Sequence, residues 1–285
     1  MKTVLEVVEA TSGYFARHGV DGPRLNAELL IAHALGKKRL DLYLEFDRPL
    51  GEGELEPARE LIRRRAKGVP LQHLLGSVEF YGREFLCDGR ALIPRPETEQ
   101  LIGALLAHEG LRRPAPRIVD VGTGSGVIAL SLAAELPEAE VTGVDLSPEA
   151  LSLAAENAAR LGFGTGPGER VCLLASDLLS GTEGEFDLIV ANLPYIAAGE
   201  IDSLSREVRH DPRSALDGGP RGTELIEALI AAAPARLRPG GLLALEIGHD
   251  QAAPLAAALE RHHYRDIRSV ADYQGVLRFL FASYG

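Results

Sequence analysis

The chain has 285 residues, a formal net charge of -11 and 46% hydrophobic residues. That length supports one large hydrophobic core and leaves residues for a second, smaller one, so we expect a main domain with an appended domain. The acidic charge disfavours a protein held to nucleic acid mainly by phosphate contacts, because Lys and Arg drive that binding by releasing counterions. We therefore expect no stable nucleic-acid binding.

The cysteines and the apolar segments exclude further classes of protein. Cys87 and Cys172 lie far apart and form no CxxC or Cys/His cluster, so the sequence indicates neither a disulfide framework nor a metal site. Residues 1–6 enter an acidic amphipathic pattern instead of the apolar run of a signal peptide, and no apolar run is long enough to span a membrane. These patterns predict a cytoplasmic protein without a membrane partner.

Residues 1–75 predict a small helical domain. Apolar residues recur there at spacings of three and four, and glycine and proline divide the region into short helices. Residues 76–93 change to shorter apolar runs, interrupted by Gly82 and by Asp88-Gly89, which predicts a β-hairpin linker. The remaining residues, 94–285, are expected to form the main domain.

Short apolar segments alternate with helical patterns from Arg117 onward. The candidate strands are residues 117–121, 140–144, 171–174, 186–190 and 241–247. Such alternation predicts a doubly wound α/β fold of the Rossmann-like kind, in which helices cover a parallel sheet. Two closely spaced apolar segments at residues 264–270 and 276–282 predict an antiparallel edge to that sheet.

A glycine-rich loop follows the first candidate strand and enters a helix near Val127. The loop residues are Gly122, Thr123, Gly124, Ser125 and Gly126. An α/β sheet places its ligand crevice at this position, and glycines allow a ligand to approach the backbone. Val127 occupies the place of the third glycine of a dinucleotide fingerprint, so the loop favours a nucleoside carrying an amino-acid tail over a pyrophosphate.

Acidic residues end the next two strands of this domain. Asp145 comes about twenty residues after the glycine loop, where a carboxylate can accept hydrogen bonds from both ribose hydroxyls. Ser147 and Pro148 then begin a helix as its N-cap and first residue. Asp177 follows the third strand and is expected to meet the adenine amino group, with Leu178 packed on the ring.

Asn192-Leu193-Pro194-Tyr195 follows the fourth strand and therefore reaches the same edge of the sheet. An amide nitrogen is a poor nucleophile, so a catalyst must hold both of its N–H groups and aim its lone pair. The Asn192 side-chain oxygen and the Leu193 carbonyl can accept those two hydrogen bonds, while Pro194 keeps Leu193 extended and Tyr195 offers a ring to stack on the substrate. With the glycine loop, this tetrapeptide predicts an S-adenosylmethionine-dependent methyltransferase acting on a planar amide or amino nitrogen.

Several separate segments of the chain resemble the release-factor glutamine N(5)-methyltransferases of the HemK/PrmC type. The matching segments are residues 92–99 (LIPRPETE), 121–126 (VGTGSG), 145–151 (DLSPEAL), 192–196 (NLPYI) and 245–248 (LEIG) with Gln251, then Asp272, Gly275 and Arg278. The resemblance covers nearly the whole chain, and residues 92–99 are its most specific part. It implies a class I methyltransferase domain joined by a hairpin to a helical N-terminal domain.

The resemblance also implies a substrate and a cofactor. The substrate would be the glutamine of the Gly-Gly-Gln motif in class-1 peptide release factors, with S-adenosylmethionine converted to S-adenosylhomocysteine and no metal involved. One position departs from the family pattern, which usually has Asn-Pro-Pro-Tyr where this chain has Leu193. Leucine keeps the backbone carbonyl, so activity is expected to survive with some loss of rigidity.

Two other functions remain open from the sequence. An adenine-N6 methyltransferase acting on RNA or DNA would need the same two acceptors, and a basic stripe beside the pocket, such as one from residues 63–67, would favour it. A cofactor-binding module without catalysis is suggested by the departure at Leu193, although Asn192 and Tyr195 are intact. Glu246 is either a carboxylate facing the pocket or a satisfied acid at a strand end.

Overall fold

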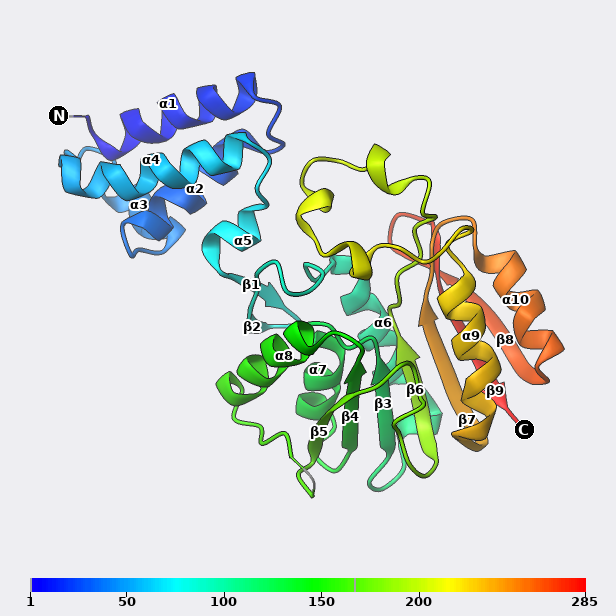
Figure 1. Cartoon of the computed structure of the whole chain (residues 1–285). Helices are drawn as coiled ribbons and strands as arrows, with labels where there is room; N and C mark the ends of the chain where they lie inside the picture. Colours follow the sequence, from blue (N-terminus) through cyan, green and yellow to red (C-terminus); the bar gives the residue numbers. More distant parts are fainter. Residues whose placement is uncertain (1, 167) are drawn as a thin grey trace. The chain divides into compact units, whose positions relative to one another are not determined.

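A computed structural model describes residues 2–166 and 168–285 (Figure 1). The chain divides into two compact units. One contains the residues up to Ser77 together with Ser205–His210, and the other contains Val78–Leu204 and Asp211–Gly285. Within the described residues, no helix has the length and apolar character needed to cross a bilayer.

The N-terminal unit is helical, as its sequence periodicity predicts. Its helices are α1 (Val4–Arg17), α2 (Pro23–Ala34), α3 (Arg39–Leu44), α4 (Glu52–Ala66) and α5 (Leu71–Leu75), followed in the same unit by the short 3-10 helix η3 (Val208–His210). Helix α1 begins with a capping box, in which Thr3 and Glu6 each accept a hydrogen bond from the other's backbone N–H. Phe15, Leu30 and Leu42 are fully buried in the core of this unit.

A buried arginine ties Ser205–His210 to these helices. Arg65, near the end of α4, is only 3% exposed. Its guanidinium donates to the Asn26 side chain at 2.7 Å and to the Glu207 carboxylate at 2.6 Å. Charge-assisted hydrogen bonds of this kind are about twice as strong as neutral ones, so Glu207 anchors its segment to the helical unit.

A β-hairpin follows the helices. It consists of β1 (Ser77–Phe80) and β2 (Arg83–Leu86), which form a separate two-stranded sheet. Tyr81 and Gly82 connect the strands with φ angles of 48° and 70°. Positive φ at both central residues is the geometry of a type I′ turn, which matches the twist of a hairpin.

The larger unit is built on a seven-stranded sheet of order β5-β4-β3-β6-β7-β9-β8. Its strands are β3 (Arg117–Val121), β4 (Glu140–Asp145), β5 (Val171–Ala175), β6 (Phe186–Ala191), β7 (Leu237–Glu246), β8 (Tyr264–Ala271) and β9 (Leu277–Tyr284). Strands β3 to β7 pair in parallel, whereas β9 pairs antiparallel with both β7 and β8. The predicted doubly wound, mostly parallel sheet with an antiparallel edge is confirmed.

Helices cover both faces of this sheet (Figure 1). They are α6 (Pro96–Ala107), α7 (Val127–Glu135), α8 (Pro148–Arg160), α9 (Glu224–Ala232) and α10 (Ala252–Arg261), with 3-10 helices η1 (Glu109–Leu111), η2 (Ile201–Ser203), η4 (Arg213–Ala215) and η5 (Ala233–Ala235). Successive strand residues face opposite sides, so Ile118 packs with α6 and α7 whereas Val119 packs with α9 and α10. Both faces are therefore buried, and the carboxyl edge of the parallel strands remains to form a site.

Candidate active site

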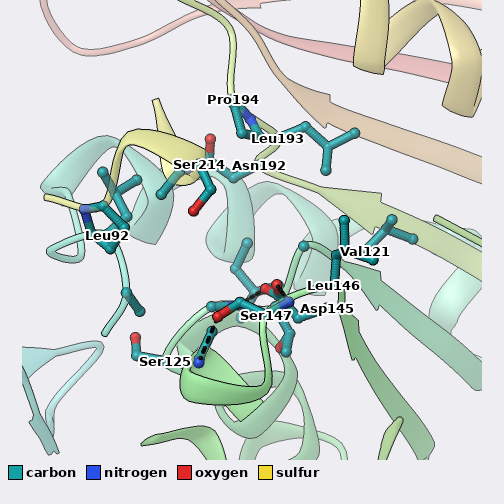
Figure 2. Close-up of a pocket in the computed structure, with 18 of the residues that line it drawn as sticks. Leu92, Val121, Ser125, Asp145, Leu146, Ser147, Asn192, Leu193, Pro194 and Ser214 are labelled. Carbon is teal, nitrogen blue, oxygen red and sulfur yellow. Dashed lines mark hydrogen bonds between the residues drawn. The ribbon is translucent and has the colours of Figure 1, made fainter. Parts of the chain in front are cut away.

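A cavity of about 390 Å³ lies at the carboxyl edge of the parallel strands (Figure 2). It is lined by every residue that the sequence places in the site except Gly126 and Tyr195. Those lining residues are Gly122, Thr123, Gly124, Ser125, Asp145, Asp177, Leu178, Asn192, Leu193 and Pro194. The fold thus brings together residues from the ends of β3, β4, β5 and β6.

The glycine loop is held open by its backbone and by a buried acid. Gly122 and Gly124 have φ angles of 73° and 56°, which glycine adopts without strain. A Cβ added at Gly122 would lie 2.8 Å from the Leu193 side chain. Behind the loop, the buried Asp120 carboxylate accepts hydrogen bonds from the Thr123 hydroxyl at 2.7 Å and from the Ala129 N–H at 3.1 Å. These contacts fix the curve of the loop where β3 passes into α7.

Gly126 serves packing instead of lining the cavity. Its φ angle is 84°, and a Cβ at this position would lie 3.0 Å from Leu130 and 3.2 Å from Ala154. The residue is the N-cap of α7. Gly126 therefore lets α7 and α8 approach each other at the point where the glycine loop ends.

Asp145 is oriented by two backbone amides. One carboxylate oxygen accepts from the Gly124 N–H and the other from the Ser147 N–H, both at 2.9 Å. Ser147 caps α8 by accepting from the Ala150 N–H at 3.1 Å, and Pro148 is the first helical residue, as predicted. Each carboxylate oxygen keeps a further acceptor site, which is the arrangement that two vicinal hydroxyls require.

The wall beyond Asp145 combines polar and apolar groups. Asp177 and Leu178 follow β5, and Leu178 has a φ angle of 49°. The Ser176 hydroxyl stabilises this turn by donating to the Leu178 carbonyl at 2.8 Å. Leu146 also lines the cavity although it is 72% exposed, which the sequence reasoning missed. An apolar residue directly after the strand-end acid was the available signal.

The Asn192 side chain is connected to a buried carboxylate through a hydroxyl. Its amide nitrogen donates to the Thr98 oxygen at 3.3 Å, and the Thr98 hydroxyl donates to Glu246 at 2.8 Å. Thr98 and Glu246 are each 2% exposed. Burial raises the pKa of Glu246 to about 7, although the hydrogen bond from Thr98 and the charge of Arg278 favour its ionised form. Glu246 therefore lies behind Asn192 and does not line the cavity.

Tyr195 differs from the other members of its tetrapeptide. Its side chain is partly buried against the hydrophobic core to which α9 and α10 contribute, and it does not line the cavity. That burial raises the pKa of the Tyr195 phenol. Its carbonyl accepts a hydrogen bond from the Gln251 side chain at 2.9 Å, which attaches this loop to the start of α10. Leu193 is also buried, at 5% exposure.

The segment at residues 92–99 begins a helix and also contacts the loop on the far side of the cavity wall. Pro96 is the first residue of α6, a position that suits proline because its missing N–H is not needed there. In addition, Asp211 accepts hydrogen bonds from the Ile93 N–H at 3.2 Å and from Arg95 at 2.7 Å. Burial raises the pKa of Asp211 to about 6. This joins the segment to the loop that carries Ser214, another residue of the cavity wall.

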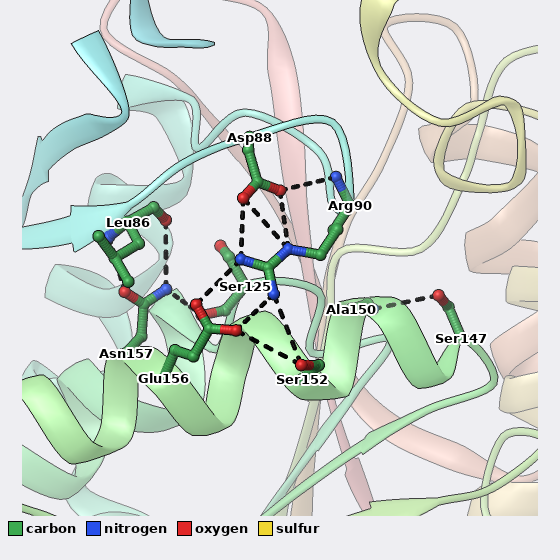
Figure 3. Close-up of polar contacts among 9 residues, drawn as sticks. All are labelled: Leu86, Asp88, Arg90, Ser125, Ser147, Ala150, Ser152, Glu156 and Asn157. Carbon is green, nitrogen blue, oxygen red and sulfur yellow. Dashed lines mark hydrogen bonds and ion pairs between the residues drawn. The ribbon is translucent and has the colours of Figure 1, made fainter.

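An asparagine of α8 braces the glycine loop from behind (Figure 3). The buried Asn157 side chain donates to the Ser125 carbonyl at 2.9 Å and also hydrogen-bonds both backbone groups of Leu86. Beside it, Arg90 is held between Asp88 and Glu156 at 2.8 Å and 2.5 Å. These contacts connect the hairpin strand β2 to the loop that lines the cavity.

The polar and apolar groups of the cavity fit a nucleoside with a polar tail. The buried Ser125 hydroxyl has no hydrogen-bond partner among the described residues, and its residue lines the cavity, so a ligand can supply that partner. Asp145 offers acceptors for hydroxyl groups, and Leu146 and Leu178 offer apolar surface for a base. Across residues 2–166 and 168–285, no group of three His, Cys, Asp or Glu side chains converges as metal ligands would.

Comparison with known proteins gives consistent relationships over nearly the whole chain. Residues 6–76 match the family described as the PrmC N-terminal domain, and residues 98–275 match the methyltransferase small domain. The chain is 41% identical to the release factor glutamine methyltransferase of Geobacter sulfurreducens over 97% of this chain and 95% of that protein. It is 45% identical to the protein of the same name from Deinococcus radiodurans, over 89% of each chain.

Solved structures agree with the fold. A methyltransferase from Pyrococcus furiosus superposes with a TM-score of 0.53 at 22% identity, covering 72% of this chain and 91% of that one. At this identity the likeness concerns the fold alone, and it agrees with the observed sheet. The extent and identity of the sequence matches, taken with the glycine loop, Asp145 and the loop that begins at Asn192, show that this chain belongs to the family of release factor glutamine methyltransferases.

Proposed function

We propose that this protein transfers a methyl group from S-adenosylmethionine to the side-chain amide nitrogen of a release-factor glutamine, in the Gly-Gly-Gln motif of class-1 factors. The observation that carries the proposal is the Asn192 amide. Its nitrogen is turned to Thr98, which leaves its oxygen as an acceptor at the cavity formed by the glycine loop and Asp145. Relatives that match nearly the full length of the chain carry the corresponding name.

We assign each part of the cofactor to residues of the cavity. Asp145 accepts hydrogen bonds from the ribose hydroxyls, Gly122, Thr123, Gly124 and Ser125 hold the amino-acid tail, and Asp177 and Leu178 meet the adenine. Leu146 adds a second apolar surface for the ring, because it is exposed beside Asp145. When bound, S-adenosylmethionine supplies an electrophilic methyl group and leaves as S-adenosylhomocysteine. No protein-bound metal has a part in this scheme.

The catalytic loop supplies positioning. The Asn192 oxygen and the Leu193 carbonyl accept the two N–H groups of the substrate amide, which turns the nitrogen lone pair toward the cofactor. Such preorganised contacts strengthen as positive charge develops on the nitrogen, and no general base is required. Pro194 keeps Leu193 extended. The stacking role of Tyr195 stays a prediction, since its ring is not part of the cavity wall.

The helical region at residues 1–75 is proposed to dock the release factor, with residues 76–93 as the hairpin linker and residues 94–285 as the methyltransferase domain. A folded protein substrate needs a contact surface larger than one cavity, and the helical unit has its own core on which to build it. An enzyme with this substrate works where translation terminates, so the proposal places it in the cytoplasm. Stable nucleic-acid binding is not part of the proposal.

The test is methyl transfer from labelled S-adenosylmethionine to purified release factor and, in parallel, to ribosomal RNA. We expect label in the release factor and none in a release factor whose Gly-Gly-Gln glutamine is changed to alanine. Label in the RNA without label in the protein would favour an adenine-N6 methyltransferase instead. Cofactor binding without transfer to either would favour a module without catalysis.

A further inference from the structure

We propose that Thr98 and Glu246 are positioning residues for Asn192, which hold its amide with the nitrogen turned inward and the oxygen toward the substrate. The proposal rests on the proposed function and explains how this chain selects one of two nearly isosteric amide orientations. An Asn192 amide rotated by half a turn would present N–H groups to the substrate N–H groups. Such an arrangement has donors on both sides and cannot hold the substrate.

Counting protons gives the direction of the hydrogen bonds. A threonine hydroxyl has one proton, and Thr98 donates it to Glu246 at 2.8 Å. An ionised carboxylate can only accept, so it fixes the direction of this bond. The Thr98 oxygen is then left as an acceptor toward Asn192, which must present its nitrogen, 3.3 Å away. Glu246 thereby determines, through Thr98, which atom of Asn192 is free at the cavity.

The three residues come from three elements, and two of them are protected from water. Thr98 lies in the first turn of α6, Glu246 ends β7, and Asn192 follows β6. Thr98 and Glu246 are each 2% exposed, so water cannot replace a lost hydrogen bond without rearrangement. In a buried series of linked hydrogen bonds, the donor or acceptor role of one group determines the role of the next. Thr98 lines the cavity whereas Glu246 does not, so Glu246 acts on the substrate only through Thr98 and Asn192.

Protonation of Glu246 would reverse the direction of the hydrogen bonds from Glu246 through Thr98 to Asn192. A carboxylic acid can donate to the Thr98 oxygen, which frees the Thr98 hydroxyl to donate toward Asn192 and favours the rotated amide. Burial raises the pKa of Glu246 to about 7; the hydrogen bond from Thr98, the charge of Arg278 on β9 and the nearby polar amide of Asn192 lower it, and Glu97 on α6 raises it. Tyr195 also faces Glu246. The active, ionised form is populated above this pKa, so the rate of transfer should fall as the pH falls through about 7.

A purely structural role predicts something else. If the bond from Thr98 to Glu246 only attached α6 to β7, its loss would lower the free energy of unfolding without changing the pH dependence of transfer. The chain offers a control for the loss of a buried threonine hydroxyl that donates to a glutamate. Thr223 is also buried, and its hydroxyl donates to Glu227 at 2.9 Å without either residue lining the cavity.

The experiment measures single-turnover methyl transfer to release factor between pH 6 and 9 and the affinity for S-adenosylmethionine, with the full chain throughout. For Thr98→Val we expect a fall in rate of about tenfold to a hundredfold, the scale of a misplaced reacting group, with cofactor affinity changed by less than about threefold. Thr98→Ser keeps the hydroxyl and should restore most of the rate. Thr223→Val should match the wild type in rate. Glu246→Gln should be slower and should lose the inflection near pH 7.

Several results would overturn the proposal. A Thr98→Val enzyme with the wild-type rate would do so, as would a Thr98→Ser enzyme no faster than Thr98→Val, or a Glu246→Gln enzyme that keeps the inflection. If Glu246→Gln does not fold, the Thr98 pair decides the matter. A wild-type enzyme that leaves release factor unlabelled would instead contradict the proposed function. Wild-type transfer that no Thr98 variant alters would contradict only the positioning role.

Discussion

The carboxylate of Asp145 illustrates how a single residue is prepared for its ligand by the backbone around it. Two N–H groups hold it at 2.9 Å, so it loses little freedom when it binds a ligand. For Asp145→Ala we expect S-adenosylmethionine to bind about 1.5–3 kcal/mol more weakly, the usual contribution of hydrogen bonds to a charged acceptor, or about tenfold to a hundredfold in Kd. Calorimetric titration measures this, with the exposed Asp250→Ala as control. Unchanged affinity would remove Asp145 from the cofactor site.

Asn192 and Leu193 are adjacent but are expected to respond differently to substitution. Asn192 acts through its side chain, so Asn192→Ala should lower turnover by about a hundredfold or more and change cofactor affinity much less. Leu193 acts through its carbonyl, which proline also has, so Leu193→Pro should be nearly neutral for turnover. Because Leu193 is buried, that variant should melt at a lower temperature. Single-turnover rates and thermal melts test both; an Asn192→Ala enzyme as fast as the wild type would contradict the mechanism.

At the scale of elements, the glycine loop and the catalytic loop are in direct contact. Gly122→Ala would place a Cβ 2.8 Å from Leu193 and force an L residue to a φ angle of 73°. We expect S-adenosylmethionine to bind about fivefold to a hundredfold more weakly, since such strain costs about 1–3 kcal/mol. In the double variant Gly122→Ala/Leu193→Ala the contact is relieved but the φ strain remains, so affinity should recover in part. Strictly additive effects in a double-mutant cycle would show that the loops are independent.

Strand positions were largely predictable because buried parallel strands are short apolar runs. The expected strand at residues 117–121 coincides with β3, and those beginning at 140, 171 and 186 end one residue earlier than the observed strands. Strand β7 was expected to begin at Gly241 but begins at Leu237. Pro239 and Gly240 usually interrupt a strand, yet Leu237 still pairs with Phe186, and the register shifts before Leu242 pairs with Leu188. A local pattern cannot reveal a pairing that resumes after an irregularity.

The polar contacts of the site were predictable only where they are local. The loop residues from Gly122 to Ser125, Asp145 and Asn192 follow strands directly, so their place at one edge was expected. Thr98 and Glu246 are 148 residues apart, and their contact depends on where β7 lies in the sheet and which face α6 covers. The sequence indicated both segments without pairing them. The sequence also placed Gly126 in the cavity, because the amino-acid type alone does not distinguish a glycine needed for helix packing from one needed for ligand binding.

At the scale of the whole molecule, the chain contributes to the helical unit twice. Residues 205–210 follow the catalytic loop in sequence but belong to the compact unit of the N-terminal helices. The ion pair of Arg65 and Glu207 spans 142 residues and stabilises that arrangement. Composition and periodicity divide the sequence only into consecutive segments, so they do not assign residues 205–210 to a domain formed by residues far earlier in the chain. The proposed docking domain therefore includes a piece of chain connected at both ends to the methyltransferase unit.

Removal of residues 1–75 should separate cofactor binding from substrate docking. The two large clusters that cover the faces of the sheet contain no residue from this region, so the truncated protein should keep its sheet and its affinity for S-adenosylmethionine. The KM for folded release factor should rise by about tenfold or more, equivalent to at least about 1.4 kcal/mol of lost docking free energy. A short peptide containing Gly-Gly-Gln fills only the cavity, so its KM should be the same for both proteins. Steady-state kinetics with the two substrates, alongside calorimetry of the cofactor, make the comparison. If the truncated enzyme methylated intact release factor as efficiently as the full chain, the helical region would not be the docking surface; a loss of cofactor affinity would mean that it supports the methyltransferase unit instead.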